Sequence, residues 1–183
     1  MAEPALGIVE VSSIARGVVV ADAMAKKAPI RILQSHPVSP GKHIVVVSGE
    51  VAEVDEAMQA GVAAAGATLV DRLFLPAAHE SLPPLLRGAS NPQPIDSAAI
   101  FETHTICAAV LAADAAAKAA EVTVVEMRLG QGIGGKGVFM LSGRLDAIEA
   151  AVLAGREVVE AALVMGVEVI ASPHEDLRHR LVW

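Results

Sequence analysis

The stretch ADAMAKKA at residues 21–28 occurs again as ADAAAKAA at residues 113–120, and this repetition decides the fold. The same separation of 92 positions relates Glu10 to Glu102. Farther along, a Gly-Lys pair recurs at a separation of 94. Because the matches keep their order across both halves, the sequence predicts a tandem duplication of one small domain rather than an array of many units.

Two copies predict two domains, which we expect at residues 1–88 and 97–183. The segment between them, about residues 89–96, contains two prolines and several polar turn formers, a composition typical of linkers. A domain of roughly 90 residues can form only one small core. Each copy is therefore expected to depend on neighbours for stability.

Hydrophobic periodicity predicts the order strand, helix, strand, strand, helix, strand in each copy. In the first copy these elements fall at residues 5–11, 13–28, 30–34, 42–48, 51–65 and 69–75. In the second copy they fall at residues 98–104, 105–120, 122–129, 136–142, a helix through 148–159, and 167–171. This order predicts an α+β fold in which helices cover one face of an antiparallel sheet.

The composition of the 183 residues excludes several classes of protein. Hydrophobic residues make up 54%, too many for a disordered chain. A net charge of −7 and an aromatic content of 2% disfavour binding to nucleic acid. The single cysteine, Cys107, cannot close an intrachain disulfide. No apolar run reaches the about 18 residues of a membrane span. We therefore expect a soluble, cytoplasmic protein without nucleic-acid or membrane partners.

The segment GQGIGGKG at residues 130–137 matches the pattern GxxxxGK of phosphate-binding loops. However, Gly137 follows Lys136 where such loops have Ser or Thr, and a strand rather than a helix is predicted next. Two interpretations remain: a glycine-rich hairpin loop, or a loop that lines an opening. The matching loop of the first copy, SHPVSPG at residues 35–41, is stiffened by two prolines and contains His36.

Other polar residues have structural interpretations. His79 and His174 are each followed by Glu, but neither copy supplies a nucleophile nearby, so we interpret them as helix-capping or interface residues. Lys26 and Lys118 follow an aspartate by four positions, the spacing of a helical ion pair. No catalytic residue and no metal-binding cluster is predicted.

The quoted repeats, together with the segments SGEVAEVDEAMQAG and SPHEDL, closely resemble the bacterial microcompartment (BMC) shell domain. With two copies in the ordinary element order, the chain resembles the non-permuted tandem branch of that family. The resemblance implies two ferredoxin-like BMC domains and a homotrimer of pseudo-hexameric shape. It also implies tiling with other BMC-domain shell proteins, in the shell of a bacterial microcompartment in the cytoplasm.

In such trimers the loop between the second and third strands of each domain surrounds a central pore, and lysines on the first helix lie at the tile edges. The implied edge residues are Lys26 and Lys118. The implied pore-lining residues are Ser35, His36, Pro37, Val38, Ser39, Pro40 and Gly41 of the first copy and Gly130, Gln131, Gly132, Ile133, Gly134, Gly135 and Lys136 of the second.

Some non-permuted relatives hold an iron–sulfur cluster with a pore-loop cysteine, whose position is Ser39 here. Hydroxyl groups are poor ligands for soft metal centres, so we expect no cofactor. The resulting expectation is a structural, non-catalytic tile whose pore passes small metabolites. Two alternatives stay open: a regulatory trimer that binds a small anion at residues 130–137, and an electron-conducting tile with a metal centre at its pore.

Overall fold

A computed structural model describes residues 5–91 and 94–178 of the chain. The domain ends at residues 1–4 and 179–183, and Pro92 and Gln93 of the expected linker, lie outside the described residues. The chain divides into two compact units. The first comprises residues up to Arg87 together with Gly130–Gly135, and the second comprises Gly88–Leu129 and the residues from Lys136 onward.

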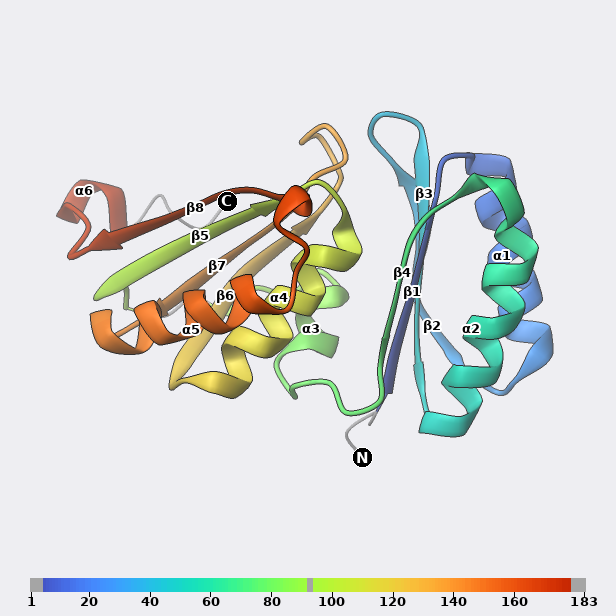
Figure 1. The fold of residues 1–183 in the computed structure, drawn as a ribbon, viewed down its shortest axis with the longest axis horizontal. Coiled ribbons are helices and arrows are strands. Elements are labelled where there is room, and N and C mark those ends of the chain that lie inside the picture. The colour runs from blue at the N-terminus through green and yellow to red at the C-terminus, as the bar shows by residue number, and fades with distance from the viewer. Residues whose placement is uncertain (1–4, 92–93, 179–183) are drawn as a thin grey trace. The chain divides into compact units, whose positions relative to one another are not determined.

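Each unit contains the predicted order of strands and helices (Figure 1). The first unit has β1 (Ala5–Val11), α1 (Ile14–Lys27), β2 (Arg31–Val38), β3 (Lys42–Gly49), α2 (Val51–Ala65), the 3₁₀ turn η1 (Gly66–Thr68), β4 (Leu69–Leu75) and α3 (Leu82–Leu86). The second has β5 (Ser97–Thr103), α4 (Ile106–Ala119), β6 (Val122–Leu129), β7 (Gly137–Gly143), α5 (Leu145–Glu157), η2 (Ala161–Leu163), β8 (Val164–Ala171) and α6 (Glu175–Arg178).

Both sheets have four antiparallel strands in equivalent orders, β2-β3-β1-β4 and β6-β7-β5-β8. The first strand of each copy is central, where it pairs with the third and fourth strands. This is the strand order of a ferredoxin-like fold, so the predicted α+β class with two tandem domains is confirmed.

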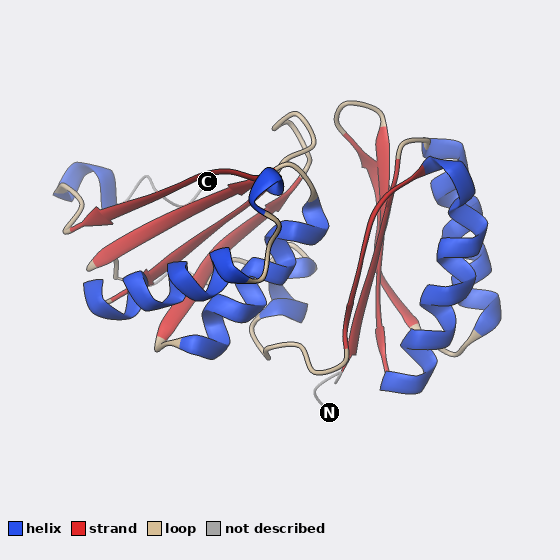
Figure 2. Ribbon diagram, viewed as in Figure 1, coloured by secondary structure: helices blue, strands red, loops and turns tan. Residues whose placement is uncertain are grey.

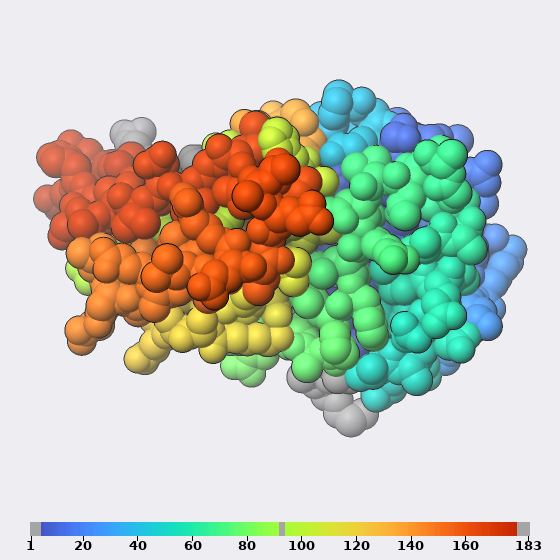
Figure 3. Space-filling model, viewed as in Figure 1, coloured from blue at the N-terminus to red at the C-terminus, as the bar shows by residue number. Residues whose placement is uncertain are grey.

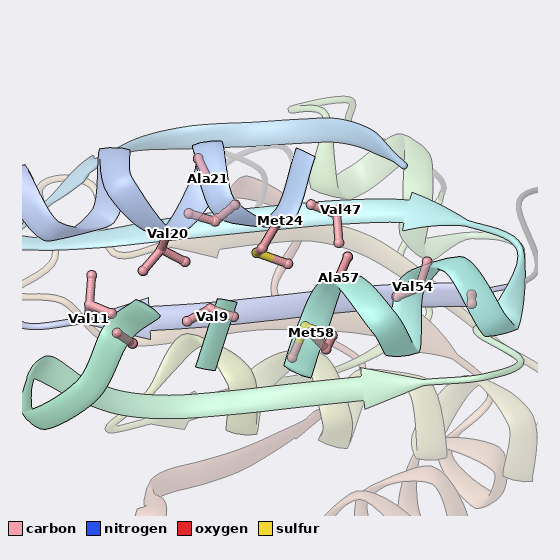
Figure 4. Close-up of a cluster of buried hydrophobic side chains, with 12 residues drawn as sticks. Val9, Val11, Val20, Ala21, Met24, Val47, Val54, Ala57 and Met58 are labelled. Carbon is pink, nitrogen blue, oxygen red and sulfur yellow. The ribbon is translucent and has the colours of Figure 1, made fainter. Parts of the chain in front are cut away.

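The core of the first unit lies between its sheet and the pair α1 and α2 (Figures 2 and 4). Small and β-branched side chains fill it, as the low aromatic content requires. The cluster consists of Ala5, Val9, Val11, Val20, Ala21, Met24, Val45, Val47, Val54, Ala57, Met58 and Ala65. The core of the second unit includes the stacked rings of Phe101 and Phe139, whose centroids are 5.0 Å apart.

The opposite faces of the sheets are partly covered, and in the first unit by a helix, which corrects the expectation that helices lie on one face only. Helix α3 contacts β2 and lies on the other side of its sheet from α1 and α2 (Figure 1). In the second unit, Ile95 packs with Ala98, Val125 and Met140. The Asn91 amide also donates to the Val125 carbonyl at 2.8 Å. The expected linker therefore packs, in its described part, against the second unit.

One helix–strand contact is built differently in the two copies. At Gly17 on α1, an added Cβ would lie 2.2 Å from Cγ of the buried His43 on β3. At the matching position of the second unit, Ala109 faces Gly137, where an added Cβ would lie 2.4 Å from the Ala109 Cβ. In the first copy the glycine is on the helix and the larger residue on the strand, whereas in the second copy the glycine is on the strand. Both arrangements allow the helix and strand to pack closely.

The helix starts follow the polar residues that precede them. Ser13 and Thr105 cap α1 and α4, and their hydroxyls accept from the amides of Arg16 and Ala108. His79 and His174 lie before the short final helices, and each Nδ1 accepts the amide of the residue two positions on, at 3.3 Å. A capping contact is thus present for His174 at the start of α6, whereas Ser81, not His79, is the N-cap residue of α3.

Candidate functional site: two hairpin loops

The loop of the first copy is shorter than the sequence predicts. Strand β2 continues to Val38, with Pro37 paired to His43, so only residues 39–41 form the turn. The expected strand ended at residue 34, because Pro37 is typical of a loop. A proline is tolerated here since β2 is an edge strand whose outward side needs no amide donor. Within this part of β2, Ser35 is exposed and His36 is half-buried.

The loop of the second copy spans the residues between β6 and β7, as predicted. Gly130, Gly132, Gly134 and Gly135 all have positive φ angles, between 67° and 78°. Residues with a Cβ rarely adopt this backbone conformation, which explains the glycine repetition. Strand β7 follows directly, so the segment has no helix start of the kind that phosphate-binding loops use.

The structure places Gly130–Gly135 in the first unit, where this loop meets the β2–β3 turn. The Lys42 ammonium donates to the Gly135 carbonyl at 3.1 Å. An added Cβ at Gly135 would lie 2.2 Å from the Ser39 carbonyl oxygen, so the two backbones touch. The Gln131 amide lies 3.3 Å from His36 Nδ1. Residues from both predicted loops are therefore brought together within one unit.

Lys42 is a functional candidate that the sequence analysis missed. Besides Gly135, its ammonium pairs with the fully buried carboxylate of Glu10. In the second copy Lys136 pairs with Glu102 at 3.0 Å, but both side chains there are more than a third exposed. The recurrence of the Gly-Lys pair is the signal in the sequence that could have identified Lys42 as the duplicate of Lys136. Neither loop contains an Asp or Glu, and the lysine that follows or ends each loop is paired with a carboxylate from a neighbouring strand.

His43 adds a buried, titratable group behind the first loop. Its Nε2 lies 3.0 Å from the Ser35 hydroxyl, while its buried Nδ1 has no hydrogen-bond partner. Burial lowers the pKa of His43 below its ordinary value, and the charge of His36 lowers it further. The imidazole is therefore held in its neutral form near pH 7.

The two candidate edge lysines have different surroundings. Lys26 is well exposed and pairs with the exposed Asp22 at 2.7 Å. Lys118 pairs in the same way with Asp114, but this aspartate is buried. The predicted spacing is thus confirmed in both helices, while only the first pair lies fully at the surface.

The described residues offer no site for a metal centre or a membrane span. Within residues 5–91 and 94–178, no three His, Cys, Asp or Glu side chains are grouped to hold a metal ion. Cys107 is buried in α4, and Ser39, where the resemblance implies a cluster ligand, carries a hydroxyl, which is a poor ligand for an iron–sulfur cluster. No helix in this part of the chain has the length and hydropathy to cross a bilayer.

Comparisons with known proteins agree with this architecture. The BMC domain profile matches residues 5–78 and 97–173. The bacterial microcompartment shell protein PduT of Citrobacter freundii is 36% identical over 97% of both chains. The crystal structure of a microcompartments protein from Desulfitobacterium hafniense DCB superimposes with a TM-score of 0.88, at 39% identity over 97% of this chain and 99% of the other.

A fused permuted hexameric shell protein of the RMM microcompartment gives a lower TM-score of 0.66, with 85% of each chain covered. At 23% identity this likeness shows only a shared fold. The ordinary strand order of both copies and the close match to PduT instead place the chain with tandem shell proteins. The chain therefore belongs to the BMC domain family, as a tandem-domain shell protein that serves a structural rather than an enzymatic role in a bacterial microcompartment.

Proposed function

We propose that this chain forms a homotrimeric, pseudo-hexagonal tile whose central pore passes small metabolites. Its modules are residues 1–88 and 97–183, joined by residues 89–96. The pore is lined by residues 35–41 and 130–136 of each chain. Tiles meet other BMC-domain shell proteins in a facet through edges that carry Lys26 and Lys118.

The observation that carries the trimer is a difference in burial between duplicated residues. On α4, Ile106 and Val110 are 0% exposed, whereas their duplicates on α1, Ile14 and Val18, are 44% and 59% exposed. The duplicated aspartates follow the same pattern, with side chains 58% exposed on α1 and 7% exposed on α4. The exposed apolar stripe formed by Ile14 and Val18 thus duplicates a stripe that is buried on α4. Such an exposed apolar surface is suited to be covered by a further copy of the chain.

The last strands differ in the opposite sense. Leu73 and Leu75 on β4 are buried, whereas Glu168 and Ile170, at the same register positions on β8, are exposed and half-buried. Each copy therefore exposes one surface whose duplicate in the other copy is buried. Two different exposed surfaces on one chain can form a head-to-tail ring when the rotation closes.

The loop chemistry supports passage of small polar metabolites. The segments 35–41 and 130–136 contain no carboxylate, and their only titratable side chains are those of His36 and Lys136. An opening lined by backbone amides and hydroxyls offers polar solutes hydrogen bonds in place of those they lose to water.

The decisive test is a charge placed in the exposed stripe. Val18→Glu is expected to convert the trimer, with three times the 18.8 kDa chain mass, into monomers. Val51→Glu is the matched control, because Val51 on α2 and its duplicate Leu145 on α5 are 41% and 38% exposed. Helices α2 and α5 lie at the surface of their units (Figure 3). Native mass spectrometry and electron microscopy would measure assembly, and a wild-type chain that stays monomeric would refute the proposal.

A further inference from the structure

Within the first unit, one lysine joins the two loops that we assign to the pore. The Lys42 ammonium donates to the Gly135 carbonyl at 3.1 Å, and its Cε would lie 2.9 Å from a Cβ added at Gly135. Gly135 is buried against the Ser39 carbonyl and Pro40. Gly135 of the second copy is thus held against the turn between β2 and β3 of the first copy.

The duplicated positions lack this arrangement. Gly41, the duplicate of Gly135, is exposed, and an added Cβ there would meet no atom within 4 Å. Lys136, the duplicate of Lys42, pairs with Glu102 and keeps a side chain that is 37% exposed, against 16% for Lys42. An ammonium group has three donors, so the pairing with Glu102 leaves capacity for a further acceptor.

We infer that Lys136 donates to the backbone carbonyl of Gly41 in a neighbouring copy of this chain, as Lys42 does to Gly135 within the chain. This inference rests on the proposed trimer and names the contact that closes it at the pore rim. In a head-to-tail ring of duplicated domains, the junction between chains is formed by the duplicates of the residues that meet within one chain. The junction between chains would then place Gly41 against Ile133 and Gly134, which duplicate Ser39 and Pro40.

The test compares two variants that both break the Lys136–Glu102 ion pair. Lys136→Met removes this pair and the contact between chains, whereas Glu102→Gln removes only the pair. The concentration at which the trimer dissociates would be measured by mass photometry and analytical ultracentrifugation. We expect Lys136→Met to raise it by about tenfold or more, since hydrogen bonds to charged groups are among the stronger ones. Glu102→Gln is expected to leave it nearly unchanged.

Two further variants keep the interpretation unambiguous. Lys136→Arg retains a cationic donor and is expected to restore most of the trimer affinity. Lys42→Met breaks the bridge inside the chain, so it is expected to lower Tm without weakening the trimer as Lys136→Met does. A stable wild-type trimer in which Lys136→Met and Glu102→Gln dissociate alike would overturn the inference while leaving the proposed function intact. A wild-type chain that never forms a trimer would overturn both.

Discussion

The reciprocal contact of Gly17 with His43 predicts a substitution whose effect changes sign with its background. Gly17→Ala places a Cβ 2.2 Å from Cγ of His43, a residue that is 2% exposed and lies on a strand paired on both sides with β1 and β2. Overpacking of this kind costs about 1–3 kcal/mol, and the severe overlap puts this site near the upper end. Alanine in place of glycine inside a helix offsets about 1 kcal/mol of that cost. The net loss is therefore about 2 kcal/mol, which lowers Tm by roughly 4–8 °C in a chain of this size.

In a His43→Gly background the overlap is absent, because the pair then matches Ala109 and Gly137 of the second copy. There Gly17→Ala is expected to stabilise by about 1 kcal/mol through helix propensity alone. Urea denaturation of the wild type, both single variants and the double variant, at one fixed protein concentration, gives the coupling energy. Ala109→Gly serves as the control in the second copy. An effect of Gly17→Ala with the same sign in both backgrounds would show that the overlap with His43 does not determine it.

Three other predictions concern the loops and the tile edge. Because the folded pKa of His43 lies below its ordinary 6.5, the native state binds fewer protons than the unfolded chain as the pH falls through that value. The free energy of unfolding should therefore decrease below pH 6.5, and denaturation curves of His43→Gln should lack this part of the dependence. Lys26→Ala removes an exposed ion pair worth only about 0.3–0.5 kcal/mol, so unfolding should change little while sheet formation in electron micrographs is reduced. Intact sheets would contradict the edge assignment. Ser39→Cys should develop iron–sulfur absorbance on reconstitution with iron and sulfide, which wild-type protein lacks, and an uncoloured variant would contradict convergence of this loop on a common axis.

The helices and most strands could be predicted because their determinants are local. Helix α2 has the predicted limits, since the apolar spacing of residues 51–65 stops at Gly66, whose φ is +53°. Strand β2 was predicted too short because the exception for Pro37 depends on its being an edge strand. That position in the sheet is a tertiary property, which no local pattern in the sequence reports.

The candidate site was predicted in position but not in its contacts. The repeat located both loops, and the family resemblance supplied their expected role. The bridge from Lys42 to Gly135 joins residues 93 positions apart, and the burial of His43 depends on Gly17 of a distant helix. Such contacts follow from the packing of the folded unit, although the duplicated Gly-Lys pair did mark the lysines.

Duplication in one chain lets the two loops differ, and the difference has a physical consequence for the proposed pore. The first loop is restricted by Pro37 and Pro40, whereas the second has four glycines with positive φ angles. A ring built from one repeated domain would place the same loop at every position of its rim. In the proposed trimer, stiff loops that carry His36 alternate with glycine loops that expose backbone amides. The rim then presents imidazole side chains at every second position only, and the glycine loops between them carry few side-chain atoms beside a passing solute.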